Sequence, residues 1–138
     1  MSFTNENFRL DGKVAIVTGA GGGFGEGIAS AYIKEGARVI VADINTEAAK
    51  RVASALGTNA SAFTCDVTRA DQVQALVAHC VSTFGIPDIV VNNAGTTLFV
   101  PMSQLDDVQA ADFQNIFGTN AIGPFQMARA AAKRMVDG

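Results

Sequence analysis

The feature that most limits what this chain can fold into is a glycine-rich turn, TGAGGGFG, at positions 18–25. The turn follows the apolar run KVAIV at 13–17, which is typical of a buried strand, and a helix is expected to begin at Phe24. Glycines serve where the backbone adopts positive φ or approaches a ligand closely, and a helix N-terminus points unpaired N–H groups at an anion. The turn therefore predicts a cradle for two phosphates.

A carboxylate in a fitting position supports this interpretation, since a glycine motif alone is a weak signal. Asp43 closes a second strand-like run, RVIVA at 38–42, about where a strand–helix–strand nucleotide-binding unit places its ribose-binding acid. The turn and the acid together predict a dinucleotide site.

Composition bounds the remaining possibilities. The chain has 138 residues, 49% of them hydrophobic, so residues 1–138 are expected to form one domain around one core. A formal charge of -3 without a basic run argues against a nucleic-acid or anionic membrane partner. Residues 1–7 lack the basic and apolar segments of a signal peptide, and no apolar run reaches the ~20 residues that span a bilayer, so a cytoplasmic protein is expected.

The two cysteines, Cys65 and Cys80, fall in a strand-like and a helix-like segment without a partner histidine pattern. They are interpreted as reduced, buried structural thiols, and no metal site is expected.

Apolar, β-branched runs near 13–18, 38–42, 60–64 and 88–92 alternate with helical patterns. Because these strands are apolar without alternation, they predict a parallel sheet covered on both faces, in the order 3-2-1-4. The fold class is α/β, a Rossmann-type doubly wound sheet that stops after the fourth strand and a following long helix. Gly36 and Gly57 are expected to end the first two helices and Thr68 to cap the third.

After the fourth strand, NNAG at 92–95 leaves the sheet at its carboxyl edge, where ligands of such sheets bind. Helical patterning resumes near Val108 and continues to the end of the chain, with interruptions expected at Gly118 and at 123–124.

Taken together, LDGKVA at 10–15, TGxxxGxG at 18–25, Asp43, the Asp66-Val67 pair, NNAG at 92–95 and Asn120 resemble the classical short-chain dehydrogenase/reductase family over nearly the whole chain. The resemblance implies a pyrophosphate turn at Gly19, Gly23 and Gly25, adenine contacts at Asp66 and Val67, and a cofactor cleft lined by 92–95. The cofactor-binding residues expected in full are Gly19, Gly22, Gly23, Phe24, Gly25, Asp43, Ile44, Cys65, Asp66, Val67, Asn92, Asn93, Ala94 and Gly95.

Two of these assignments have structural alternatives. Asp66 is also placed to act as a helix-entry carboxylate near Thr68, and Asn92 and Asn93 are also typical of a strand-ending turn.

Asn120 is the one catalytic candidate. By resemblance it corresponds to the family's active-site asparagine, whose main chain holds a water in a kinked helix. Pro124 lies four residues later and cannot donate to the Asn120 carbonyl, which favours such a kink. The alternative is a solvated kink without catalytic meaning.

The expected cofactor is NAD, with NADP less favoured. Asp43 suits a ribose 2′-OH and repels a 2′-phosphate. The positions where NADP-preferring relatives place basic side chains hold Gly22, Phe24 and Ile44.

By resemblance the chain is part of an NAD(P)-dependent oxidoreductase acting on a small alcohol or ketone, whose identity the residues do not reveal. The family's YxxxK pair is absent from the 138 residues, and the lone tyrosine and histidine, Tyr32 and His79, fall outside the cleft segments. We therefore interpret the chain as the front half of an enzyme, inactive alone and prone to associate.

In the complete family the long helix also packs against its copy, so a homo-oligomer is expected. The alternative function is a non-catalytic dinucleotide-binding module acting through assembly. An interaction protein without a nucleotide is disfavoured by Asp43 and Asp66.

Overall fold

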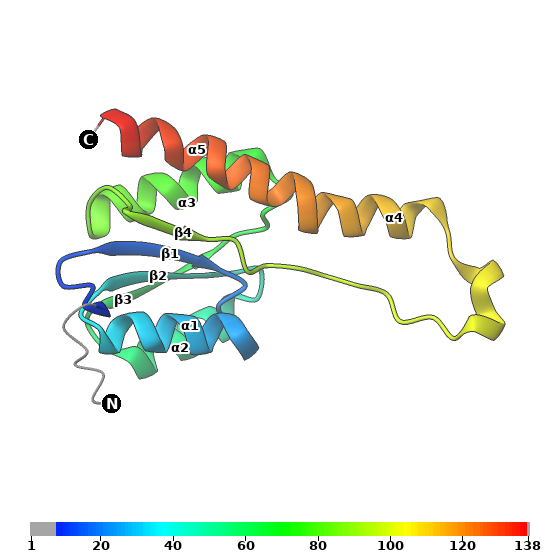
Figure 1. Cartoon of the computed structure of the whole chain (residues 1–138), viewed down its shortest axis with the longest axis horizontal. Coiled ribbons are helices and arrows are strands. Elements are labelled where there is room, and N and C mark those ends of the chain that lie inside the picture. The colour runs from blue at the N-terminus through cyan, green and yellow to red at the C-terminus, as the bar shows by residue number, and fades with distance from the viewer. Residues whose placement is uncertain (1–7, 138) are drawn as a thin grey trace.

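The computed structural model describes residues 8–137, and its four strands form one parallel sheet in the order β3-β2-β1-β4 (Figure 1). This order is the one that the sequence predicts. The strands are β1 (Val14–Thr18), β2 (Arg38–Asp43), β3 (Ala60–Thr64) and β4 (Ile89–Val91). The helices are α1 (Gly23–Lys34), α2 (Thr46–Leu56), α3 (Ala70–Thr83), a 3-10 segment (Met102–Asp107), α4 (Ala110–Phe117), a π-helical segment (Gly118–Ile122) and α5 (Gly123–Asp137).

Helices cover both faces of the sheet, α1 and α2 on one face and α3 and α5 on the other (Figure 1). Alternate residues of β1 face opposite layers: Ala15 and Val17 pack with α1 and α2, whereas Ile16 packs with α3 and α5. Because both faces are buried, the strands are apolar at nearly every position, which is why they lack the alternation of a half-exposed sheet.

The helices begin and end near the residues predicted from the sequence, except at the start of α3. Gly36 and Gly57 lie directly after α1 and α2 with positive φ, as expected. Thr68 was predicted to cap α3, and this is wrong: the N-cap is Arg69, without a side-chain cap bond. Arg69 N–H donates to the Asp66 carbonyl at 3.0 Å, so a turn precedes the helix and Thr68 lies one residue before the N-cap, where its hydroxyl donates to the Asp66 carboxylate at 2.7 Å.

The predicted interruption between α4 and α5 is a π-helical turn, and the helical path continues through it (Figure 1). Gly123 N–H bonds to the carbonyl of Gly118, five residues earlier. Pro124 has no N–H, and a widened turn accommodates this loss without breaking the helix. Gly123 packs against Val67, where a Cβ would lie 2.7 Å from Val67 Cγ2, so the turn brings α5 close to the segment after β3.

Beyond the sheet, the segment after β4 runs out to the 3-10 segment and returns through α4 (Figure 1). Phe113 and Phe117 of α4 and Phe125 and Met135 of α5 are exposed, whereas Ile116 of α4 is only partly exposed. Within residues 8–137 no helix combines the length and the apolar character needed to cross a membrane.

Candidate functional site

A cavity of about 560 Å³ lies at the carboxyl ends of the strands, where the sequence predicts ligand binding. Its volume falls within the range of ordinary small-molecule pockets. It is formed by the glycine-rich turn, the ends of β2 and β3, the segment after β4 and the end of α4. The lining residues are Gly19, Gly22, Phe24, Asp43, Ile44, Cys65, Asp66, Val67, Asn93, Ala94, Gly95, Thr96, Asn115 and Thr119.

Four expected site residues do not line this cavity: Gly23, Gly25, Asn92 and Asn120. Gly25 is buried behind the turn, where a Cβ would meet Asn93 Nδ2 at 2.5 Å, so it permits close packing of α1 on the turn. Asn92 is exposed at the end of β4. Gly23 opens α1 with φ of 56°, a conformation that favours glycine.

The turn is braced from the β4 side. Asn93 Nδ2 donates to the carbonyls of Thr18 and Gly19, both at 3.0 Å, and Ala94 N–H donates to Thr18 Oγ1 at 3.1 Å. A Cβ on Gly19 would lie 2.8 Å from Ala94 Cα. The backbone of the turn is therefore pressed against the segment after β4, and only glycine fits there. Asn93 therefore has a structural role, because its side chain holds the turn, and it also lines the cavity.

Asp43 is oriented by two backbone donors. Its Oδ2 accepts from Gly21 N–H and its Oδ1 from Asn45 N–H, each at 2.9 Å. Each carboxylate oxygen has a second lone pair, so both can still accept a hydroxyl proton from the cavity. The donors fix the direction of the carboxylate, as a ribose-binding acid requires.

Asp66 shows both properties that the sequence suggests. Its Oδ1 accepts from Thr68 N–H at 2.9 Å, which is the helix-entry role, and the residue also lines the cavity. Beside it, burial first and the charges of Asp66 and Asp71 second raise the pKa of the Cys65 thiol to about 11. The thiol is therefore neutral at pH 7 and acts as an apolar wall rather than a nucleophile. Within the described part of the chain no cluster of metal-ligating side chains occurs.

Asn120 lies at the back of the site rather than in the cavity wall. Its Oδ1 accepts from Thr96 N–H at 2.8 Å and its Nδ2 donates to the Thr96 carbonyl at 2.9 Å. This two-point contact ties the π-helical turn to the segment after β4. The neighbouring Thr119 and Asn115 line the cavity in its place, and neither was predicted. Their helical spacing of four residues on one face was the available signal.

Arg51 of α2, which reaches the glycine-rich turn, was not predicted either. Its Nη2 donates to the Gly21 carbonyl at 2.9 Å, and its guanidinium pairs with Glu26 of α1. Ala48, three residues earlier on the same helix face, approaches Gly21 as well.

The other two candidates for chemistry lie away from the cavity, as expected. Tyr32 packs beside the core under α1 and α2. His79 Nε2 lies 3.1 Å from Ser61 Oγ, and its ring contacts Phe63 with centroids 4.9 Å apart.

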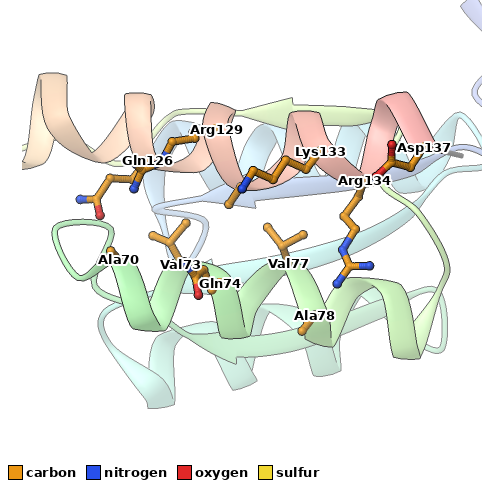
Figure 2. Close-up of a pocket in the computed structure, with 11 residues that line it drawn as sticks. Ala70, Val73, Gln74, Val77, Ala78, Gln126, Arg129, Lys133, Arg134 and Asp137 are labelled. Carbon is orange, nitrogen blue, oxygen red and sulfur yellow. The ribbon is translucent and has the colours of Figure 1, made fainter.

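A separate hollow of about 390 Å³ lies between α3 and α5 (Figure 2). Val73 and Val77 form its α3 wall, and the basic side chains Arg129, Lys133 and Arg134 extend from α5 (Figure 2). It contains no residue of the glycine-rich turn, so it is distinct from the cavity at the strand ends.

Comparison with known proteins agrees with this fold and site. A model of the family described as short chain dehydrogenase matches residues 13–138, and the chain belongs to this family. It is 42% identical over 134 residues to D-threitol dehydrogenase of Mycolicibacterium smegmatis, covering 95% of this chain and 50% of that protein. It is 40% identical over 136 residues to 7alpha-hydroxysteroid dehydrogenase of Escherichia coli, covering 96% and 52%.

Among solved structures, the fold resembles 3-ketoacyl-(acyl-carrier-protein) reductase from Brucella melitensis complexed with NADH. The TM-score is 0.86 at 40% identity, over 91% of this chain and 51% of that one. The chain thus spans about half the length of the curated relatives that it matches.

Proposed function

We propose that this protein binds NAD and belongs to an oxidoreductase that transfers hydride between the nicotinamide and a small alcohol or ketone. The observation that carries the proposal is the convergence of the glycine-rich turn, Asp43 and Asp66 on one cavity at the strand ends. The family membership and the NADH complex of the Brucella melitensis reductase support it.

Each part of the cavity has a role in this proposal. The turn and the N-terminus of α1 hold the pyrophosphate, because a Cβ-free backbone and unpaired N–H groups suit an anion. Asp43 accepts from the ribose hydroxyls. Asp66 and Val67 contact the adenine, and Asn93 to Gly95 line the path towards the nicotinamide.

The open space at Gly22, where a Cβ would meet nothing within 4 Å, fits a ligand over the turn. Asn120 orients the catalytic end of the site through Thr96.

The bound nicotinamide supplies the hydride acceptor in alcohol oxidation or the donor in ketone reduction. The alcohol proton needs a separate base, which the family provides with a YxxxK pair. The 138 residues contain no such pattern. We therefore propose that they bind the dinucleotide without completing hydride transfer.

Calorimetric titration of the purified protein with NAD and with NADP tests the proposal. We expect Asp43→Ala to weaken NAD binding by about tenfold or more, since a hydrogen bond to a charged group contributes about 1.5–3 kcal/mol. The same change should improve NADP binding relative to NAD. Asp43→Asn removes the charge and also turns one acceptor of a backbone N–H into an NH2 donor. Asp71→Ala, an acid outside the cavity, serves as the control. Absence of heat with both dinucleotides, or an unchanged affinity ratio in Asp43→Ala, would contradict the proposal.

A second candidate is a non-catalytic dinucleotide-binding module that acts through assembly. The exposed Phe113, Phe117 and Phe125 favour it, because clustered apolar surface of this kind marks association. We also propose a homo-oligomer, formed through α4 and α5. Light scattering tests the oligomer. Neither function predicts turnover by the 138 residues alone, so light scattering with and without NAD separates them: only a module that acts through assembly requires its oligomeric state to respond to NAD.

A further inference from the structure

One residue of the turn, Gly21, is held by charged side chains at both of its polar groups. Its N–H donates to Asp43 Oδ2 at 2.9 Å, and its carbonyl accepts from Arg51 Nη2 at 2.9 Å. The residue is buried, and a Cβ on it would lie 2.9 Å from Asp43 Oδ2 and 2.8 Å from the Ala48 Cβ. A guanidinium and the proposed ribose carboxylate therefore flank the same glycine.

The charge of Arg51 is matched by a specific partner. Nη1 donates to Glu26 Oε1 at 3.2 Å and Nη2 to Glu26 Oε2 at 3.0 Å, a two-point contact between the first turn of α1 and the second turn of α2. The hydrogen bond from Arg51 lowers the pKa of the Glu26 carboxyl below its usual range, so Glu26 is ionised at neutral pH. The pair is neutral as a unit, and it stays partly solvated, with side-chain exposures of 58% for Arg51 and 37% for Glu26.

This arrangement bears on the choice between the two dinucleotides, which differ by a phosphate on the ribose that Asp43 is proposed to bind. A guanidinium binds phosphate well, because its planar donors match the phosphate oxygens. The cavity wall itself contains no lysine or arginine among the described residues. Arg51 is a cation that contacts the turn, and Glu26 and the Gly21 carbonyl accept three of its five N–H donors.

We propose that Arg51 and Glu26 are a second specificity-determining element of the dinucleotide site. Glu26 neutralises Arg51 and keeps it on the Gly21 carbonyl, so that the carboxylate of Asp43 dominates and NAD is preferred. Loss of the Glu26 charge frees the guanidinium for a 2′-phosphate. This inference rests on the proposed dinucleotide binding. The alternative is that the ion pair of Arg51 and Glu26 only links α1 to α2, which would stabilise the fold without affecting the choice of dinucleotide.

The first test measures dissociation constants for NAD and NADP in Glu26→Gln. We expect the affinity ratio to shift towards NADP by about fivefold, the scale of a partly exposed ion pair of ~1 kcal/mol. The matched control is Glu47→Gln, because Glu47 also pairs with a cation of α2, Lys50 at 3.4 Å, but lies in an ion pair that does not include the turn. An equal ratio in Glu26→Gln, Glu47→Gln and the unmodified protein would overturn the inference.

The second test removes the cation in an Asp43→Asn/Glu26→Gln background, where the Asp43 carboxylate no longer repels the phosphate and Glu26 no longer neutralises Arg51. We expect Arg51→Met to weaken NADP binding by about tenfold, the size of a lost charged hydrogen bond, and NAD binding by less than about twofold. Lys50→Met, which removes a neighbouring cation, should leave the ratio unchanged. The loss with Arg51→Met should shrink as salt rises, because exposed charges are screened.

The outcomes separate this inference from the proposed function. Equal weakening of NAD and NADP by Arg51→Met would identify a structural tie and overturn the specificity role, while dinucleotide binding stands. An unmodified protein that binds neither dinucleotide would overturn the proposed function and this inference together. Circular dichroism of each variant confirms that a change in ratio comes from a folded protein.

Discussion

The wall of the cavity adjoins the segment that runs from residue 96 through the 3-10 segment and α4 to residue 117, here called the extension. The two regions are built in opposite ways. In the wall, Thr18, Asp43 and Asn93 each make hydrogen bonds at or below 3.3 Å that fix the glycine-rich turn. In the extension, Phe99 is 92% exposed and Met102 is 86% exposed. The wall is internally complete, whereas the extension presents apolar surface without cover in the described residues.

From this difference we infer that the proposed dinucleotide binding is separable from catalysis in this chain. The elements that would hold a dinucleotide complete their contacts within residues 14–67 and the segment after β4. By contrast, α4, through which we propose that the protein associates, has exposed aromatic side chains such as Phe113 and Phe117. Dinucleotide binding therefore depends on residues that are already supported, and association or turnover depends on residues that are not.

The largest effect on the free energy of unfolding is expected in the cavity wall. Gly25→Ala places a Cβ against the Gly19 carbonyl and 2.5 Å from Asn93 Nδ2, both parts of the turn. We expect it to lower the free energy of unfolding by about 3 kcal/mol, the upper range for overpacking. Gly27→Ala, on the same helix with open space around it, should raise that free energy by about 0.5–1 kcal/mol. Urea unfolding of both variants measures the contrast, and equal midpoints would show that the turn has room to relax.

A smaller effect is expected where the wall meets the extension. Asn120→Ala removes both contacts with Thr96, which together contribute about 1–2 kcal/mol. Because this tie is local, we expect faster hydrogen exchange at the Thr96 amide and little change at amides of β1. Gln114→Ala, an exposed position on α4, is the control. Unchanged exchange at Thr96 would mean that other contacts hold the start of the extension.

The sequence predicts the wall well because its residues act locally or through backbone geometry. The apolar runs predict the strands. The glycine-rich turn and Asp43 predict the position of the site, since parallel strands bring their carboxyl ends to one edge of the sheet. The prediction of Thr68 as a cap failed because a turn closed by Arg69 N–H and the Asp66 carbonyl, at 3.0 Å, precedes the helix, so that Thr68 lies one residue before the N-cap, which no periodicity reveals.

Arg51 and Thr119 show what local patterns miss. Arg51 lies 30 residues from Gly21 in sequence, and their contact depends on how α2 packs beside α1. Thr119 shares a helix face with Asn115, but the spacing alone does not show that this face borders the cavity, which depends on how α4 and the π-helical turn lie against the segment after β4.

Asp88, which directly precedes β4, allows the stability of the fold to be tested against pH. Asp88 accepts from Val14 N–H at 2.9 Å and from Lys13 Nζ at 3.2 Å, and the Val14 bond lowers its pKa. Its folded pKa is therefore below its unfolded one, so its stabilisation is present above about pH 4 and is lost as pH falls through the folded value.

Because Asp88 is partly exposed, we expect Asp88→Asn to cost less than about 1 kcal/mol at pH 7. The stability difference between Asp88→Asn and the unmodified protein should vanish in acid. Urea unfolding from pH 2 to 7, with Asp106→Asn of the 3-10 segment as control, measures this. A difference that persists at low pH would show that packing rather than charge is lost.

The smallest effect on the free energy of unfolding is expected at Phe113, and it tests directly whether the extension lacks cover. Phe113 is 58% exposed on α4, so Phe113→Gln should change the free energy of unfolding by no more than about 0.5 kcal/mol. Met127→Gln, a similar loss of apolar surface at a buried position of α5, should cost several times more. Phe113→Gln should at the same time reduce light scattering, because it removes apolar surface available for association. If the two substitutions cost the same, Phe113 is buried in solution by another copy, and the extension is an assembled interface as fully supported as the cavity wall.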